Sequence, residues 1–177
     1  YMSAAPLNPS YKTNEYEFYL KDLNPKIVIV EPNSSNEVVG VAKNLNIPVC
    51  EMKIKKDDPS GLFNLFDIES EYQLPEENDE GLVLHTSGTT SRPKIVPLTN
   101  KNIYSSAENI SKSLNLSEAD HCLNIMPLFH IHGLIAIIAA SMKVGASVCA
   151  SNGFNAIKFL EIAKSEKITW YSGVPTM

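Results

Sequence analysis

The sequence predicts an α/β fold in which parallel-rich sheets are flanked by helices. Short apolar runs rich in β-branched residues alternate along the chain with segments whose apolar residues recur every three or four positions. This alternation is typical of strands and helices in turn. A strand–helix–strand order needs a crossover connection, so we expect parallel strands joined by right-handed crossovers. The 177 residues are 44% hydrophobic, which is enough to bury a core of this kind.

The first part of the chain predicts one such unit. The run Ile-Val-Ile-Val at 27–30 has no polar position, so we expect a strand that is buried on both faces. Ser34 with Glu37 predicts a capping box at the start of the next helix. The expected elements are a helix over 15–23, a strand over 26–30, a helix that carries Val38, Ala42 and Leu45, and a strand over 47–52.

An acidic connection follows this unit. From residue 67 to residue 80 all seven charged residues are acidic. Such a run is more typical of a solvated segment between sub-units than of an interaction tail. We therefore expect two α/β parts, one over residues 1–75 that includes the connection and one over residues 76–177.

The second part begins with two strands joined by a loop. Thr99 follows them and is expected to cap a helix whose apolar residues lie on one face. The expected elements are strands over 81–85 and 94–98, a helix carrying Ile103, Ala107, Ile110 and Leu114, a strand over 121–125, a helix over about 133–144, a strand over 147–150, a helix around Phe159, Leu160 and Ala163, and a strand over 168–172.

Charge and cysteine usage exclude several classes of protein. The net charge of −5 offers no electrostatic footprint for nucleic acid, so a bound polyanion would need local donors. The three cysteines lack zinc-site spacing, which favours reduced thiols in an intracellular protein. The most apolar stretch, 134–142, is shorter than the roughly 20 residues of a transmembrane helix. Because the chain starts at Tyr1 and stops at Met177 within a Val-Pro-Thr stretch, we expect a fragment.

The loop between the two strands of the second part concentrates phosphate donors. Its nine residues, 86–94, read Thr-Ser-Gly-Thr-Thr-Ser-Arg-Pro-Lys and contain five hydroxyl side chains. Hydroxyls and loop amides can surround phosphate oxygens, Gly88 allows a close backbone approach, and Arg92 and Lys94 supply positive charge. The loop is not a Walker loop, because no second glycine precedes the lysine and a strand follows. Composition alone leaves open the alternative that it is an ordinary turn.

The run 86–94 resembles the phosphate-binding signature of the adenylate-forming superfamily, the AMP-binding acyl-CoA synthetases and their relatives. Three further stretches agree in the family's order: residues 5–9, the run Met-Pro-Leu-Phe-His-Ile-His-Gly-Leu at 126–134, and residues 169–171 followed by 174–176. His85, Ser91 with Arg92, and the Phe-His-Ile-His-Gly run most resemble the oxalate–CoA ligase or peroxisomal CoA-synthetase branch. The resemblance implies a piece of the large N-terminal domain.

One departure from the family pattern affects the backbone after the loop. Ile95 stands where a glycine is common, and a β-branched residue resists positive φ. We therefore expect the strand after the loop to start differently.

The resemblance implies a ligase that activates a small carboxylic acid as an acyl-adenylate and transfers it to coenzyme A, with ATP and Mg²⁺. It implies that Lys94 and His130 are catalytic, that His130 and His132 bind the substrate, and that Thr89 or Thr90 lies near Mg²⁺. The residues implied for nucleotide binding are Thr86, Ser87, Gly88, Thr89, Thr90, Ser91 and Lys94. No nucleic-acid partner and no transmembrane segment are expected, and the location implied is the cytoplasm or the peroxisome.

Several alternatives stay open at this point. The two histidines could bind a metal, although the motif offers no third ligand, and His132 could simply pack in the core. The chain could instead derive from an adenylation domain that loads a carrier protein, or it could be a truncated, non-catalytic nucleotide-binding module. A fragment is expected to be inactive alone, since the family's other motifs lie outside it.

Overall fold

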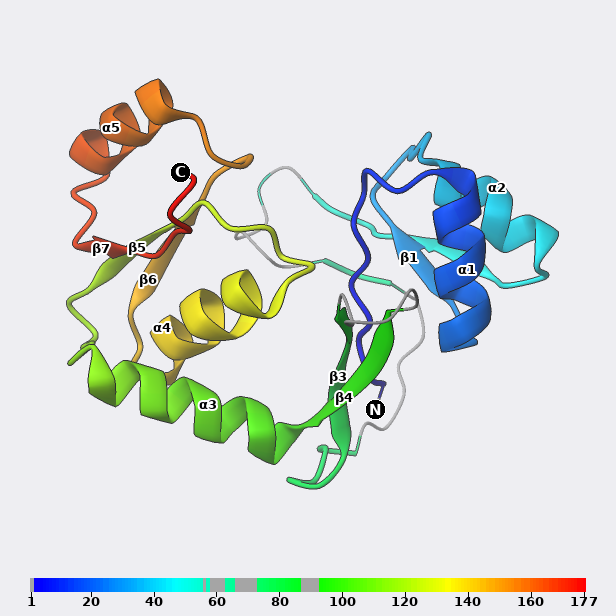
Figure 1. Cartoon of the computed structure of the whole chain (residues 1–177), viewed down its shortest axis with the longest axis horizontal. Coiled ribbons are helices and arrows are strands. Elements are labelled where there is room, and N and C mark those ends of the chain that lie inside the picture. The colour runs from blue at the N-terminus through cyan, green and yellow to red at the C-terminus, as the bar shows by residue number, and fades with distance from the viewer. Residues whose placement is uncertain (1, 56, 58–62, 66–72, 87–92) are drawn as a thin grey trace. The chain divides into compact units, whose positions relative to one another are not determined.

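The structure is a computed structural model that describes residues 2–55, 57, 63–65, 73–86 and 93–177. The chain divides into two compact units (Figure 1). One comprises Leu7–Gln73, and the other comprises Tyr1–Pro6 with Leu74–Met177.

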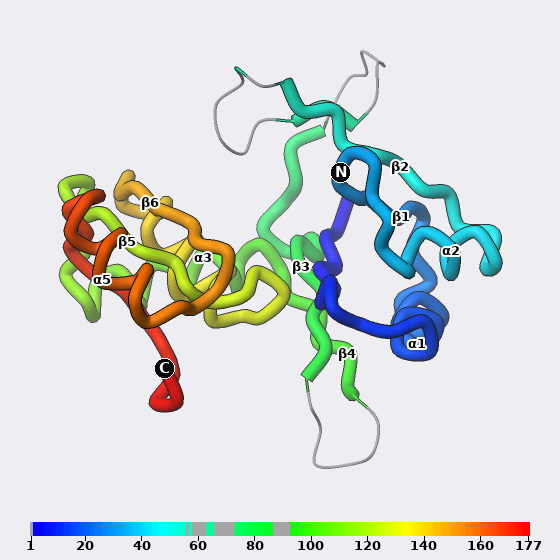
Figure 2. Tube along the Cα trace, turned by 90° about the horizontal axis from the view of Figure 1, so that it is seen from above, coloured from blue at the N-terminus to red at the C-terminus, as the bar shows by residue number. Residues whose placement is uncertain are grey.

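The Leu7–Gln73 unit contains a strand–helix–strand crossover. Its elements are α1 (Thr13–Leu23), β1 (Val28–Val30), α2 (Glu37–Asn44) and β2 (Val49–Glu51). The two strands pair in parallel, with Val28 opposite Val49, and lie side by side in Figure 2. The predicted order of elements and the predicted parallel pairing are therefore confirmed in this unit.

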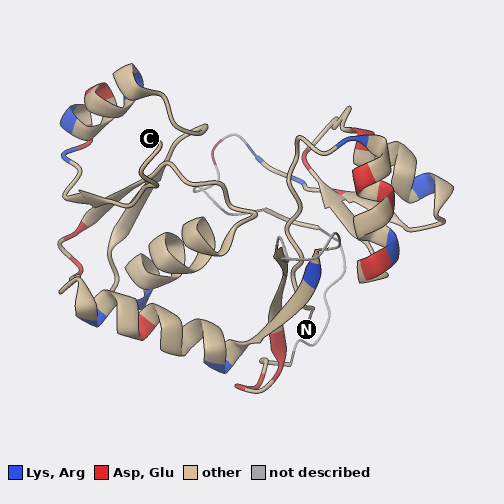
Figure 3. Cartoon of the chain, viewed as in Figure 1, with Lys and Arg blue, Asp and Glu red and all other residues tan. Residues whose placement is uncertain are grey.

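The core of this unit lies on one face of its sheet. Val28 and Val30 are buried against Tyr16 and Leu20 of α1 and the valines of α2. Ile29, between them, is 41% exposed, so the prediction of a strand buried on both faces was wrong. Both helices pack on the same face, and successive strand residues point to opposite faces. The outer side of α1 carries charged residues, including the i,i+4 pair of Glu17 and Lys21 (Figure 3).

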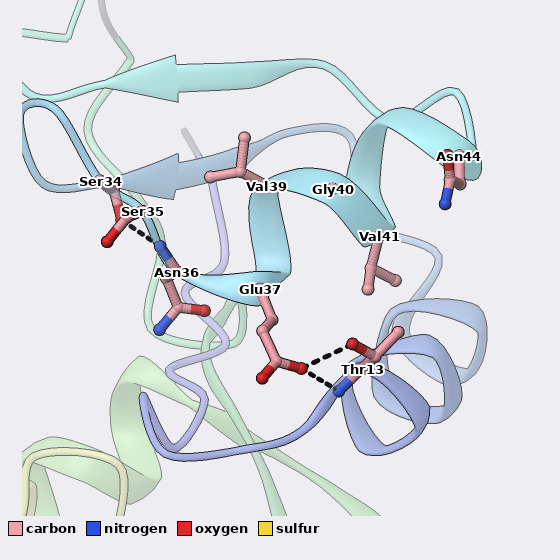
Figure 4. A pocket seen from close by; sticks show the side chains of 9 residues that line it. All are labelled: Thr13, Ser34, Ser35, Asn36, Glu37, Val39, Gly40, Val41 and Asn44. Carbon is pink, nitrogen blue, oxygen red and sulfur yellow. Dashed lines mark hydrogen bonds between the residues drawn. The ribbon is translucent and has the colours of Figure 1, made fainter.

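The cap of α2 is Asn36, and the predicted capping box of Ser34 and Glu37 was wrong. The Asn36 side chain accepts a hydrogen bond of 2.9 Å from the backbone N–H of Val38. Glu37 instead accepts hydrogen bonds from the N–H and the hydroxyl of Thr13 at 2.6 Å each (Figure 4). A capping box would need the helix to begin at residue 35. The helix begins at Glu37 instead, and the carboxylate of this residue bonds to Thr13 of α1.

The other unit begins with a hairpin followed by a helix. Strands β3 (Glu80–Thr86) and β4 (Lys94–Thr99) pair antiparallel, and α3 (Asn100–Ser113) follows directly. Thr99 caps α3 as predicted: its hydroxyl accepts from the N–H of Asn102 at 3.1 Å, and the Asn102 side chain accepts from the N–H of Thr99 at 3.0 Å. Ala4 forms a parallel bridge with Leu82 and extends the hairpin by a short third segment.

A parallel three-stranded sheet completes this unit. Strands β5 (His121–Asn124), β6 (Ser147–Ala150) and β7 (Trp170–Tyr171) run in the order β6-β5-β7. The helices are the π-helix η1 (His132–Ala139), its continuation α4 (Ala140–Lys143), and α5 (Ala156–Ser165). The predicted helix over 133–144 is confirmed as helical, although its first eight residues have π geometry. The strand predicted over 168–172 is shorter, because only two of its residues pair with β5.

The cap of α2 yields a stability prediction. Replacing Asn36 with Ala removes the acceptor for the Val38 amide, and we expect the free energy of unfolding to fall by about 1 kcal/mol. Ser34→Ala is the matched control and should change it far less, because Ser34 does not cap the helix. Urea unfolding followed by circular dichroism measures both variants. Equal losses, or a larger loss for Ser34→Ala, would show that the cap is misassigned.

Candidate functional site

The two ends of the predicted phosphate-binding run face each other across the β3–β4 hairpin. Thr86 is the last residue of β3, Lys94 is the first residue of β4, and the two are paired in the antiparallel register. Ser87, Gly88, Thr89, Thr90 and Ser91, all predicted to bind nucleotide, lie outside the described residues. The position of the hairpin end is thus observed, and the roles of the residues within the run stay predictions.

Thr86 and Lys94 lie on the same face of the hairpin. Leu82 and Leu84 of β3 are 7% and 6% exposed and pack against Ile135 of η1. Side chains alternate along a strand, so Thr86 continues the face of these two leucines, and its antiparallel partner Lys94 shares that face. Both residues are exposed. A hydroxyl donor and an ammonium group therefore project together just beyond the end of the apolar core, where an anion can meet both.

The backbone after the loop accommodates Ile95 as an ordinary strand residue. β4 already begins at Lys94, and Ile95 pairs with His85 in the extended ladder. Positive φ is therefore not needed at this position, and the family's glycine is dispensable here. The change from glycine leaves the pairing of the two loop ends intact.

The segment that carries the two histidines is held at both ends. It leaves the carboxyl end of β5, where the side chain of buried Asn124 accepts a hydrogen bond of 3.0 Å from the N–H of Met126. It enters η1 at His132, and at the next residue, Gly133, a β-carbon would lie 2.5 Å from the carbonyl oxygen of Pro127. Only glycine permits this backbone approach without a shift. The turn between residues 126 and 133 is therefore positioned by backbone contacts.

His130 and His132 have different surroundings. His130 is exposed, with its ring centroid 4.5 Å from that of Phe129. His132 is half-buried, and its Nε2 lies 2.7 Å from the Oγ of Ser172. The segment thus presents one imidazole to solvent and fixes the second against the residue that follows β7. Ser172 was not singled out by the sequence, since only the tertiary structure brings it to His132.

Both histidines lie beyond the carboxyl ends of the parallel strands. In open α/β sheets, ligands bind outside this edge. The chain reaches it after β5 at Ile125, after β6 at Ser151 and after β7 at Ser172. The backbone N–H of Ser151 donates a hydrogen bond of 3.0 Å to the carbonyl oxygen of Asn124, which holds β6 beside β5 up to the edge. The edge is therefore rigid where it carries the histidine segment.

An open pocket of about 430 Å³ lies within the Leu7–Gln73 unit, around the start of α2 (Figure 4). Hydrogen bonds from Thr13 hold the pKa of the Glu37 carboxyl below its usual range, so this group is ionised at neutral pH. A carboxylate already satisfies the donors there and would repel a phosphate. We assign no chemistry to this pocket, whose other lining residues are Ser34, Ser35, Asn36, Val39, Gly40, Val41 and Asn44.

In the described part of the chain, no three histidine, cysteine or acidic side chains come together as a metal site. Neither does any helix in those ranges have the length and apolar character needed to cross a membrane.

Comparison with known proteins shows which family this chain resembles. The family model described as AMP-binding enzyme matches residues 2–177. An oxalate–CoA ligase of Arabidopsis thaliana is 37% identical over 99% of this chain and 35% of its own length. An oxalate–CoA ligase of Saccharomyces cerevisiae is 31% identical over 98% of this chain and 37% of its own length. The chain therefore spans little more than a third of these relatives.

A solved structure gives the same result for the fold. The o-succinylbenzoate coenzyme A synthetase of Bacillus subtilis, in complex with ATP and magnesium ion, is similar with a TM-score of 0.76 and 27% identity. The match covers 98% of this chain and 34% of that chain. The predicted α/β fold and the resemblance to the oxalate–CoA ligase branch are thereby confirmed. The chain belongs to the AMP-binding enzyme family.

Proposed function

We propose that this chain is part of an ATP-dependent acid–thiol ligase that activates a carboxylic acid as an acyl-adenylate and transfers the acyl group to coenzyme A. The observation that carries the proposal is the pairing of Thr86 with Lys94, which frames the phosphate-binding run at the end of the hairpin. The CoA ligases among its relatives support coenzyme A as the acceptor over a carrier protein. The retained lysine argues against a non-catalytic module.

The proposed reaction has two steps. The carboxylate oxygen attacks the α-phosphorus of ATP, and the bond to pyrophosphate breaks to give acyl-adenylate. The thiolate sulfur of coenzyme A then attacks the acyl carbonyl carbon, and AMP leaves. Because the first step brings an anion to a polyanion, it depends on charge neutralisation and positioning more than on covalent help.

The phosphate-binding run would supply that neutralisation. Thr86 and Lys94 contact the β- and γ-phosphates in this proposal, together with Ser87, Gly88, Thr89, Thr90 and Ser91 of the intervening run. Mg²⁺ accepts hydroxyl and phosphate oxygens as ligands, so the hydroxyl of Thr89 or Thr90 would hold the metal, which would neutralise phosphate charge. The complex of the Bacillus subtilis relative with ATP and magnesium ion supports this part of the proposal.

The acid would bind beside the histidine segment. His130 is exposed and lies nearest the reacting carboxylate in this proposal, whereas His132 lines the wall of the acyl pocket. Two imidazoles suit an acid with a second polar or anionic group better than an alkyl chain. Oxalate, named in both curated relatives, is a dicarboxylate, so a short dicarboxylic acid is the substrate class that we propose.

The activity would belong to the complete protein. Since the chain spans only 35% of its Arabidopsis relative, the residues that hold the rest of the nucleotide are expected elsewhere in the protein. We therefore expect acid-dependent ATP–pyrophosphate exchange from the complete protein and none from the 177-residue chain alone, because most of the positioning is lost. Exchange by the isolated chain would refute this expectation.

Lys94→Ala tests the role of the hairpin end. A charge-assisted contact contributes roughly 1.5–3 kcal/mol, so we expect the Kd for ATP and the rate of adenylation in the complete protein to worsen by about 10- to 100-fold. Lys101→Ala is the matched control, because Lys101 is an exposed lysine of α3 that pairs with Glu77. Isothermal titration and pyrophosphate exchange measure the two effects. Unchanged affinity and rate in Lys94→Ala would remove the assigned role.

A panel of acids tests the substrate class. We expect kcat/KM for oxalate or malonate to exceed that for butyrate or benzoate by at least about tenfold, the discrimination that one well-placed hydrogen bond provides. Coupled detection of AMP release in the complete protein gives these values. A preference for the monocarboxylic acids would overturn the proposed substrate class and leave the ligase reaction in place.

A further inference from the structure

We infer that Ser172 is a positioning residue that fixes the imidazole of His132 at the wall of the acid-binding site. The consequence for substrate rests on the proposed function. The juxtaposition of the two side chains is independent of it. Ser172 lies outside the phosphate-binding run and the histidine segment.

The contact is short and joins two distant segments. The Oγ of Ser172 lies 2.7 Å from the Nε2 of His132, and the two residues are 40 positions apart in the chain. Both side chains are partly buried. A polar pair removed from water is costly to leave unmade, so the hydrogen bond holds the ring in one orientation.

Both partners stand on rigid backbone. Ser172 directly follows β7, whose Tyr171 is in register with Leu123 of the central strand β5. His132 is the first residue of η1 and precedes Gly133, whose backbone approaches Pro127 closely. Neither end can drift without breaking a strand pairing or a backbone contact. The hydroxyl therefore acts as a fixed anchor for the ring.

The anchored ring keeps one nitrogen for a ligand. Within the described part of the chain, the hydrogen bond to Ser172 is the interaction recorded for the His132 side chain. With Nε2 engaged, Nδ1 is left to meet a polar group of the substrate. An imidazole that rotates freely about its Cβ–Cγ bond could present either nitrogen or a carbon atom of the ring to the substrate. Ser172 thus makes His132 selective for an acid whose second polar group lies at one particular distance from the reacting carboxylate.

The inference predicts a selective loss of acid binding. In the complete protein, Ser172→Ala should raise KM for a dicarboxylic acid such as oxalate by about tenfold or more and leave KM for ATP within about twofold. Ser172→Thr keeps a hydroxyl at this position and should restore most of the affinity for the acid. A general structural defect would affect both substrates, and the threonine variant would not repair it.

A measurement on the ring itself does not depend on activity. The 177-residue chain has four histidines, so ring-¹⁵N-labelled histidine gives a short set of resonances that a His132→Asn variant assigns. We expect Ser172→Ala to shift the Nε2 resonance of His132 and Ser172→Thr to leave it near its original position. His121 is an internal control, because its Nδ1 lies 3.0 Å from the carbonyl oxygen of Glu166 and must carry the proton there.

Ser151→Ala is the matched control variant. Ser151 follows β6 as Ser172 follows β7, but its hydroxyl bonds to the carbonyl oxygens of Asn124 and Gly153. The His132 resonance should not move in this variant.

The outcomes separate the inference from the proposed function. An unmoved His132 resonance in Ser172→Ala overturns the inference, whatever the activity. A moved resonance with an unchanged KM for the acid in an active protein also overturns it. Absence of exchange with every acid in the unsubstituted protein contradicts the proposed function instead, and the resonance still decides whether Ser172 fixes the ring.

Discussion

The register of the β3–β4 hairpin sets the relative position of the two ends of the predicted phosphate-binding run. Thr86 and Lys94 are directly opposite, and both continue the face that buries Leu82 and Leu84. A slip of one residue would turn the lysine to the other face, because side chains alternate along a strand. The apolar contact of the leucines with η1 therefore secures the relative position of two polar groups beyond it. Core packing and the position proposed for phosphate binding therefore depend on the same register.

A second constraint is the parallel pairing of β5 with β6 and β7. It brings the carboxyl ends of three strands, separated widely in sequence, to one edge. The histidine segment leaves this edge, and the close approach of Gly133 to Pro127 closes its turn. The π geometry of η1 begins at His132, and such geometry is frequent at functional sites. The sheet thus holds the histidine segment that we propose to bind the acid, whereas the hairpin holds the two ends of the predicted phosphate-binding run.

The proposed nucleotide site depends on hydrogen-bond donors and positive charge close to the phosphates. The chain carries a net charge of −5, so its overall field repels a nucleotide. Lys94 is the only charged residue of β4, and the one acidic residue of β3 is Glu80, at the start of that strand. Lys94 and Glu80 lie at opposite ends of the hairpin ladder. The proposed site therefore relies on a local cation with hydroxyl and amide donors instead of a broad basic surface.

The sequence by itself determined the order of elements, the cap of α3 and the family, since each depends on neighbouring residues. Thr99 and Asn102 are three positions apart, and the loop run is continuous. Only the tertiary structure decided that one face of β1 is exposed, that Glu37 bonds to Thr13 and leaves the cap to Asn36, and that Ser172 meets His132. The contacts of Glu37 with Thr13 and of Ser172 with His132 join residues far apart in the chain, where local propensity and spacing carry no information about distance.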